Sequence, residues 1–158
     1  MTGACVTGAD IDENWLEYVH NRYSTSRYYV ANALTLPFED KSFSHVLSIT
    51  ALCFTPDWKG ALAEVIRVAG ERITIGLLNG NSLLWWKKGR KARSAFDGAK
   101  WIAPAELLEA ANVLPLEDIR ISIAIYLPSG SVLAQATGRM LQNRPNRRSF
   151  LLLTAKTV

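Results

Sequence analysis

Apolar and polar positions vary along the chain in a way that predicts strands and helices in turn. Apolar runs typical of buried strands fall at residues 4–9, 27–31, 43–49, 72–78, 119–126 and 149–156. Apolar residues at helical spacing lie between these runs and predict helices that begin near Asp12, Thr55 and Pro104, with another at residues 132–141. This alternation predicts an α/β fold of one domain with a mainly parallel sheet.

Helix-end signals define two of these helices more closely. Asp12 is expected to cap the first one, because its carboxylate can accept hydrogen bonds from the free N–H groups of the first turn. Thr55 is expected to cap the second, with Pro56 in its first turn and Gly70 at its end. The buried face of this second helix is predicted to consist of Ala61, Leu62, Val65, Ile66 and Ala69.

Polar residues follow three of the predicted strands. Asp10 ends the first strand, Asn32 follows the second, and Thr50 follows the strand at residues 43–49. In open α/β sheets, ligands bind outside the carboxyl ends of the strands. We therefore expect the loops that carry these side chains to meet at one binding site. A carboxylate at such a place can accept hydrogen bonds from both hydroxyl groups of a ribose.

Three features resemble one known family: Asp10 after a strand, the turn N-A-L-T-L-P-F-E-D at residues 32–40, and T-A-L-C-F at residues 50–54. They are similar to the class I S-adenosylmethionine-dependent methyltransferases, in particular the small-molecule branch called type 11. The resemblance implies a Rossmann-like sheet, mainly parallel with an antiparallel last strand. It also implies that residues 1–158 form a single methyltransferase-like domain from the family's second strand onward, without its first strand and glycine-rich loop.

The resemblance also implies roles for residues on the cofactor side. Asp10 would hold the ribose hydroxyls, and Ile11 would offer an apolar face to the adenine ring. Asn32 stands where the family has an acid, so its amide oxygen would accept from the adenine amino group without the strength of a full charge. The N–H of Ala33 would donate to the ring. Thr50, with Ala51 beside it, would form the wall near the methionine part.

On the acceptor side, the resemblance implies that Phe54, Asn79, Trp85 and Trp86 lie near a small-molecule substrate. The tryptophans could equally belong to a helix that packs on the sheet. The pattern identifies no catalytic residue, because transfer from an activated methyl donor depends mainly on in-line positioning and exclusion of water. We expect no metal ion in the site.

Without the glycine-rich loop, S-adenosylmethionine binding is predicted to be impaired. In the family the missing first strand lies between strands 2 and 4, so two sheet edges would lack a partner. The sequence could begin at an internal methionine of a longer protein, pair with another copy or a partner along the open edge, or be a remnant that no longer binds cofactor. The leading hypothesis is a methyltransferase, or a truncated form of one, that acts on a small molecule. The alternative is a non-catalytic remnant or interaction subunit.

The composition of the chain adds little to these functional hypotheses. The net charge of +4 comes largely from residues 87–93 and 139–148, which we expect to be solvated loops rather than a nucleic-acid surface. Cys5 and Cys53 have no metal-ligand spacing and are expected to be buried, as is His45. No signal peptide and no membrane span is visible in the sequence, so the predicted location is the cytoplasm.

Overall fold

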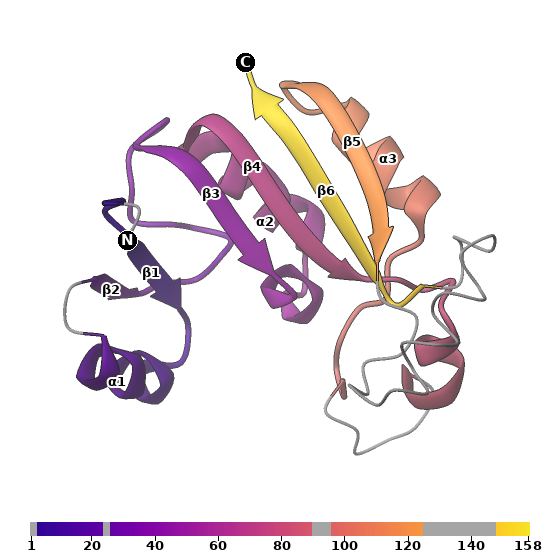
Figure 1. Ribbon diagram of the computed structural model, residues 1–158, viewed down its shortest axis with the longest axis horizontal. Helices are drawn as coiled ribbons and strands as arrows, with labels where there is room; N and C mark the ends of the chain where they lie inside the picture. Colours follow the sequence, from indigo (N-terminus) through magenta and orange to yellow (C-terminus); the bar gives the residue numbers. More distant parts are fainter. Residues whose placement is uncertain (1–2, 24–25, 90–95, 125–147) are drawn as a thin grey trace.

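The computed structural model describes residues 3–23, 26–89, 96–124 and 148–158 (Figure 1). Its strands are β1 (Thr7–Asp10), β2 (Arg27–Val30), β3 (Phe43–Ile49), β4 (Ala69–Leu78), β5 (Leu116–Ala124) and β6 (Phe150–Thr157). Its helices are α1 (Glu13–Arg22), α2 (Trp58–Val68), α3 (Pro104–Asn112), the 3-10 turn η1 (Ala51–Phe54) and the π-helical turn η2 (Trp85–Gly89). The predicted helix at residues 132–141 lies outside the described residues.

The strands form two separate sheets. β1 and β2 are parallel and form the smaller one. The larger sheet has the order β3-β4-β6-β5, in which β3 and β4 are parallel and β6 runs antiparallel to both of its neighbours. This confirms the predicted α/β class with an antiparallel last strand. In the described part of the chain, no strand pairs with the second edge of β1 or of β3.

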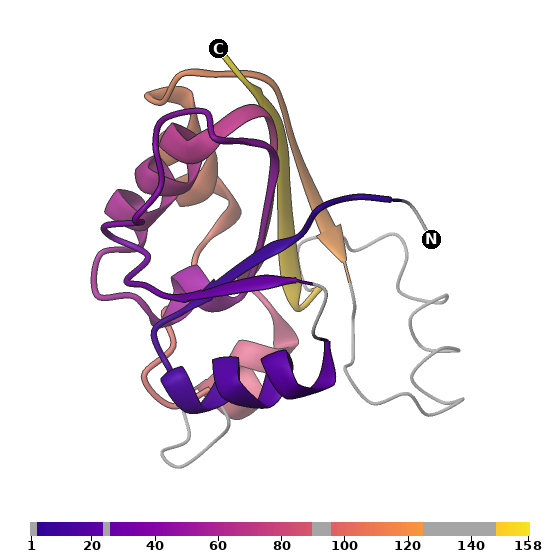
Figure 2. The same ribbon diagram turned by 90° about the vertical axis from the view of Figure 1, so that its left-hand side faces the viewer.

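The hydrophobic core belongs to the larger sheet. Figure 2 shows α2 and α3 on the same face of that sheet. Side chains from the second helix and from the two central strands are fully buried there, among them Leu62, Ile75 and Leu153. Four members of the predicted buried stripe, Ala61, Leu62, Val65 and Ile66, lie on α2 and are buried, which confirms them. Ala69 is buried too, but it is the first residue of β4.

The ends of the helices agree with the sequence signals in one case and differ in the other. Asp12 caps α1 by accepting from the N–H of Asn14 at 2.9 Å, as predicted. The cap of α2 is Asp57, which accepts from the N–H of Gly60 at 3.0 Å. The prediction for Thr55 was wrong, because its hydroxyl donates back to the carbonyl of Leu52 at 2.7 Å. α2 ends at Val68 with Ala69 as its C-cap, so Gly70 is the first residue beyond the cap, close to the predicted stop.

Two predictions of burial were wrong. Cys5 and His45 are both exposed. Cys5 precedes β1, which belongs to the small sheet with few buried side chains. His45 lies on the face of β3 opposite Val46, and α2 and α3 cover only the face on which Val46 packs against the core. Cys53 is buried as expected, and burial raises the pKa of its thiol. Among the described residues, no helix has both the length and the apolar character needed to cross a membrane.

Candidate functional site

The first candidate residues lie where β1 ends. Asp10 is the last residue of β1, and its Oδ1 accepts from the backbone N–H of Asp12 at 3.0 Å. The other carboxylate oxygen has no partner among the described residues, so it can accept hydrogen bonds from a ligand. Ile11 follows with its side chain largely exposed. A carboxylate acceptor therefore lies next to an apolar side chain, which suits a ribose and the flat ring attached to it.

The turn after β2 is held by its own side chain. Oδ1 of Asn32 accepts from the N–H of Leu34 at 3.0 Å, which closes a short turn of the kind that asparagine favours. Ala33 and Leu34 pack against the core of the larger sheet. The amide oxygen expected to meet an adenine amino group is thus already engaged, although it keeps a second lone pair. Its amide group remains exposed.

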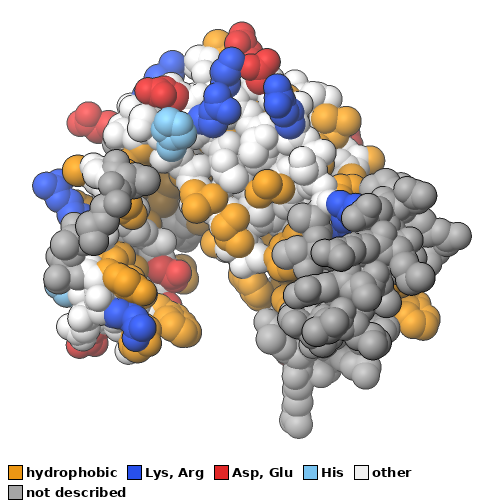
Figure 3. Space-filling view, in the orientation of Figure 1, with side chains coloured by type: hydrophobic (Ala, Val, Ile, Leu, Met, Phe, Trp, Pro, Cys, Tyr) orange, Lys and Arg blue, Asp and Glu red, His pale blue; other side chains and the backbone are white. Residues whose placement is uncertain are grey.

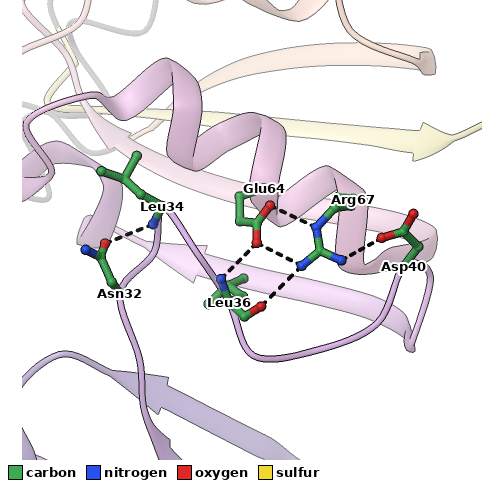
Figure 4. Close-up of polar contacts among 6 residues, drawn as sticks. All are labelled: Asn32, Leu34, Leu36, Asp40, Glu64 and Arg67. Carbon is green, nitrogen blue, oxygen red and sulfur yellow. Dashed lines mark hydrogen bonds and ion pairs between the residues drawn. The ribbon is translucent and has the colours of Figure 1, made fainter.

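Glu64 and Arg67 of α2 fix the continuation of this turn (Figure 4). Oε1 of Glu64 accepts from the N–H of Leu36 at 2.8 Å, and Nη2 of Arg67 donates to the carbonyl of the same residue at 3.2 Å. The two side chains also bind each other in a fork, at 2.9 Å and 2.8 Å. The hydrogen bond from Arg67 is the main reason that the pKa of Glu64 is lowered.

Asp40 extends this network to the far end of the turn. Its Oδ1 accepts from Nη1 of Arg67 at 2.6 Å. The hydrogen bonds to Glu64 and Asp40 raise the pKa of the guanidinium. Sequence reasoning had not assigned a role to Glu64 or Arg67. Their spacing of three residues on a helix is the signal that could have identified them as a pair.

Thr50 lies at the end of β3 in an unusual backbone conformation. Its φ of 62° is in the left-handed region, which a β-branched residue rarely adopts. Its N–H donates to the carbonyl of Gly76 at 2.8 Å, and its hydroxyl donates to the carbonyl of Ile49 at 2.7 Å. Strained residues of this kind cluster at ligand sites and persist only where the surrounding structure enforces them. The strain therefore supports a functional interpretation of this strand end.

The η1 turn divides into a buried half and an exposed half. Leu52 and Cys53 are buried in the core, and Sγ of Cys53 accepts from the N–H of Leu78 at 3.3 Å. Ala51 and Phe54 are exposed. The exposed pair is therefore available to a ligand, and the buried pair fixes η1 against β4.

The acceptor-side candidates in the segment after β4 differ in their exposure. Asn79 is fully buried, and its amide group donates to the carbonyl of Arg148 at 2.7 Å while its oxygen accepts from the N–H of Asn81 at 2.9 Å. Both the amide nitrogen and the amide oxygen of Asn79 are therefore hydrogen-bonded to backbone groups. Trp85 and Trp86 line an open pocket of about 540 Å³; the rest of its lining is Gly80, Asn81, Ser82 and Leu83.

The strand ends that carry these residues lie on one side of the molecule. Figure 1 shows β1, β3 and β4 with their carboxyl ends directed the same way. The space-filling view shows a hollow on that side, between the part around β1 and the part around β3 (Figure 3). No hydrogen bond among the described residues joins Asp10, Asn32 and Thr50 to one another. Asp10 and Asn32 belong to strand ends of the smaller sheet, and Thr50 belongs to a strand end of the larger one.

Comparison with known proteins identifies this architecture. Residues 1–71 match the family described as a methyltransferase domain. Among solved structures, an S-adenosylmethionine-dependent methyltransferase of Thermotoga maritima, described as a possible histamine N-methyltransferase, has a TM-score of 0.74 and 18% identity. The likeness covers 95% of this chain and 72% of that chain. The chain has the class I methyltransferase fold.

Two curated relatives are similar to part of the chain. A stretch of 82 residues is 35% identical to an uncharacterized protein of Mycobacterium tuberculosis and covers 49% of this chain. A stretch of the same length is 32% identical to Methyltransferase GfsG of Streptomyces halstedii and covers 47% of this chain. The matched part is 30% of the length of each relative.

Methyltransferases of this family use S-adenosylmethionine in general, so the strand ends can be tested for their fit to it. The adenosine part fits the chemistry present, because Asp10 has a free carboxylate oxygen and Ile11 exposes an apolar side chain next to it. Asn32 fits less well, because Oδ1 already accepts from the N–H of Leu34. These residues suit a nucleoside better than they suit the amino-acid end of the cofactor.

Proposed function

We propose that this chain acts in methyl transfer from S-adenosylmethionine to a small-molecule acceptor. The observation that carries the proposal is the carboxylate of Asp10 at the carboxyl end of β1 in a methyltransferase fold, where one oxygen has no partner among the described residues. The adenosine part would lie over this strand end, held by Asp10 and Ile11. Thr50 and Ala51 would line the methionine part, and Asn32 with Ala33 would contact the ring.

The acceptor would enter from the pocket beside Trp85 and Trp86. Aromatic side chains and an open volume of about 540 Å³ suit a flat organic molecule rather than a polymer. When bound, the cofactor supplies an activated methyl group, so the residues of this chain only bind, orient and exclude water. Phe54 is exposed on η1 and would cover one side of the reacting groups.

Affinity for the cofactor tests the proposal, by isothermal titration with S-adenosylmethionine and with its demethylated product. We expect weak but measurable binding of both. The variant Asp10→Asn removes one charged acceptor. It should weaken the affinity for the cofactor by about 10- to 100-fold, because a hydrogen bond to a charged group contributes roughly 1.5–3 kcal/mol. Glu13→Gln removes an exposed carboxylate three residues away and should leave the affinity unchanged.

The titration also has a clear negative result. If a folded chain gives no heat at millimolar ligand, this chain does not bind the cofactor and the proposal fails. Equal loss in Asp10→Asn and Glu13→Gln would contradict the assigned role of Asp10. A methyl-transfer assay with candidate acceptors is informative only after binding is established.

Among the residues that the structure describes, β1 and β3 each have one unpaired edge, and this favours a second candidate function. In that case the chain is a non-catalytic interaction subunit that uses the methyltransferase fold as a scaffold. Two copies could also pair along a free sheet edge, since unpaired N–H and C=O groups are a template for another strand. A folded chain that binds neither S-adenosylmethionine nor its demethylated product, in the same titration, would support this second candidate.

A further inference from the structure

The backbone N–H groups of the turn after β2 are nearly all engaged. Four consecutive N–H groups follow Asn32, and the side-chain oxygen and the carbonyl of Asn32 accept from the second and the third, each at 3.0 Å. Oε1 of Glu64 accepts from the fourth, the N–H of Leu36, at 2.8 Å. The first belongs to Ala33 and has no partner among the described residues. Of these four groups, only the N–H of Ala33 is therefore available to a ligand.

One face of α2 holds this turn. Gly60, Glu64 and Arg67 follow one another at intervals of four and three residues, which places them on the same side of the helix. A Cβ at Gly60 would lie 3.3 Å from Cδ2 of Leu34, so the missing side chain lets Leu34 approach the helix closely. Glu64 accepts from the N–H of Leu36 and Arg67 donates to its carbonyl, so the backbone is held on both sides (Figure 4). The helix thus contacts the turn at two successive points.

Both carboxylate oxygens of Glu64 are already engaged. Oε2 accepts from Nε of Arg67 at 2.9 Å, and Oε1 accepts from Nη2 of Arg67 at 2.8 Å as well as from Leu36. Arg67 also donates to Asp40 at 2.6 Å, at the far end of the turn. A fork of this kind fixes two side chains in one geometry. Glu64 and Arg67 therefore act on the candidate site only through the turn.

Few other contacts fix the turn relative to the larger sheet. Among the described residues β2 pairs only with β1, and Leu16 is the one apolar side chain of their unit that is buried as deeply as the core. Ala33 and Leu34 are only partly buried against that core. The direction of the N–H of Ala33 therefore depends on the contacts with α2.

We propose that Glu64 and Arg67 are positioning residues for recognition of the nucleoside base. They hold the turn so that the N–H of Ala33 is directed at an acceptor nitrogen of the ring. The inference rests on the proposed function, since it requires that the adenosine part lies at this turn. It goes beyond that function, because selectivity for the base then depends on two side chains of α2 that do not touch the ligand.

Two ligands that differ only at the edge of the base give the inference its test. One is the demethylated product, S-adenosylhomocysteine, and the other is S-inosylhomocysteine, in which an oxo group replaces the amino group. The ring nitrogen beside that group accepts a hydrogen bond in adenine and carries a hydrogen in hypoxanthine. The second ligand would leave the N–H donor unpaired, so the chain should bind the first at least about tenfold more tightly. Isothermal titration measures the ratio of the two dissociation constants.

Two variants at one position separate geometry from charge. Glu64→Ala removes the acceptor for the N–H of Leu36 together with the partner of Arg67, so the ratio should fall to about threefold or less. Glu64→Gln keeps an oxygen acceptor at the same place, and its ratio should stay within about twofold of that of the unmodified chain. Rescue by glutamine would show that the hydrogen bond to the turn, rather than the charge, sets the selectivity.

Val65→Ala is the matched control on the same helix. It truncates a neighbouring apolar side chain that is buried in the core, and it should lower stability. A smaller folded fraction weakens both ligands by the same factor, so the ratio should remain that of the unmodified chain. A role of Glu64 in stability alone would leave its ratio unchanged for the same reason.

Three results of the titrations would count against the inference. Unchanged selectivity in Glu64→Ala, or an equal loss in Val65→Ala, would overturn it. A ratio near one in the unmodified chain would overturn it too, while the proposed function would stand because both ligands still bind. If a folded chain binds neither ligand, the proposed function itself fails, and the inference fails with it.

Hydrogen exchange gives a measurement without ligand. In NMR spectra of the isotope-labelled chain, the amide of Leu36 should exchange about tenfold or more faster in Glu64→Ala than in the unmodified chain, relative to the amides of β4. If the amide of Leu36 keeps its protection in this variant, Glu64 does not hold the turn and the inference is wrong.

Discussion

The two sheets of this molecule differ most in how much of each is buried. The β3-β4-β6-β5 sheet with α2 and α3 contains nearly every buried apolar side chain of the described residues. In the unit formed by β1, α1 and β2, the only apolar side chain buried to this degree, within the described part, is Leu16. Half of the large exposed apolar side chains belong to that small unit. Two strands and one helix enclose too little volume to exclude water.

The small unit is attached to the rest of the fold by a short stretch of chain. The ring of Phe38 contacts Tyr29 of β2 on one side and Phe43 of β3 on the other, at centroid distances of 5.2 Å and 4.9 Å. Glu64 and Arg67 bind the same stretch from α2. The position of Asp10 relative to Thr50 therefore depends on these contacts rather than on a continuous sheet. Half of the candidate site is carried by the less stable region.

Hydrogen exchange of backbone amides should show the largest difference between the two regions. We expect amides of β1, α1 and β2 to exchange about 100-fold or more faster than those of β4 and β6, because local opening exposes few buried contacts in the small unit. Mass spectrometry of peptic fragments measures this. Similar protection in both regions would mean that the small unit is stabilised by something other than its own packing.

Truncation of one apolar side chain in each region should show the next largest effect. Leu77→Ala removes a fully buried side chain of β4 and should lower the free energy of unfolding by about 2–5 kcal/mol. Val30→Ala removes a side chain that is 56% exposed on β2 and should change it by less than about 0.5 kcal/mol. Urea denaturation measures both. Comparable losses would contradict the difference in burial.

The contribution of the Glu64–Arg67 ion pair to stability should depend on pH. The pKa of Glu64 is lowered in the folded chain, chiefly by its hydrogen bond with Arg67. The ionised form therefore stabilises the fold above the ordinary value of 4.5, and this stabilisation is lost as the pH falls through the lowered pKa. Glu64→Gln should cost about 1 kcal/mol at pH 7 and less at acidic pH.

The matched control for this change is Glu109→Gln, an exposed carboxylate on α3. It should leave the pH profile of stability unchanged. The pKa of Asp118 is also lowered, first by its hydrogen bond with Lys156, but that pair is present in both variants and cancels from the comparison. If Glu64→Gln has the same effect at pH 7 and pH 4, the ion pair does not contribute to the attachment.

The positions and types of the elements could largely be predicted from the sequence. The partly apolar run at residues 43–49 predicted the bounds of β3, and Asp12 predicted the start of α1. These signals depend only on residues close together in the sequence, so they predict the same element in any tertiary context. The methyltransferase resemblance, which rested on Asp10 and the turn at residues 32–40, correctly identified the fold.

Burial and long-range contacts could not be predicted in the same way. His45 lies in a largely apolar strand, yet it is exposed, because its side chain is on the face of β3 that α2 and α3 do not cover. The bonds from Glu64 and Arg67 to Leu36 join residues about thirty positions apart, and no local pattern specifies them. The roles of the candidate site residues stay predictions.

The two thiols of this chain differ in a way that has a practical consequence. Cys53 is enclosed in the core, and its raised pKa keeps it protonated near neutral pH. Cys5 is open to solvent just ahead of β1. A maleimide dye or a spin label added to the native molecule would thus attach at one place, where it reports how the N-terminal unit moves against its neighbour, with no engineered cysteine required.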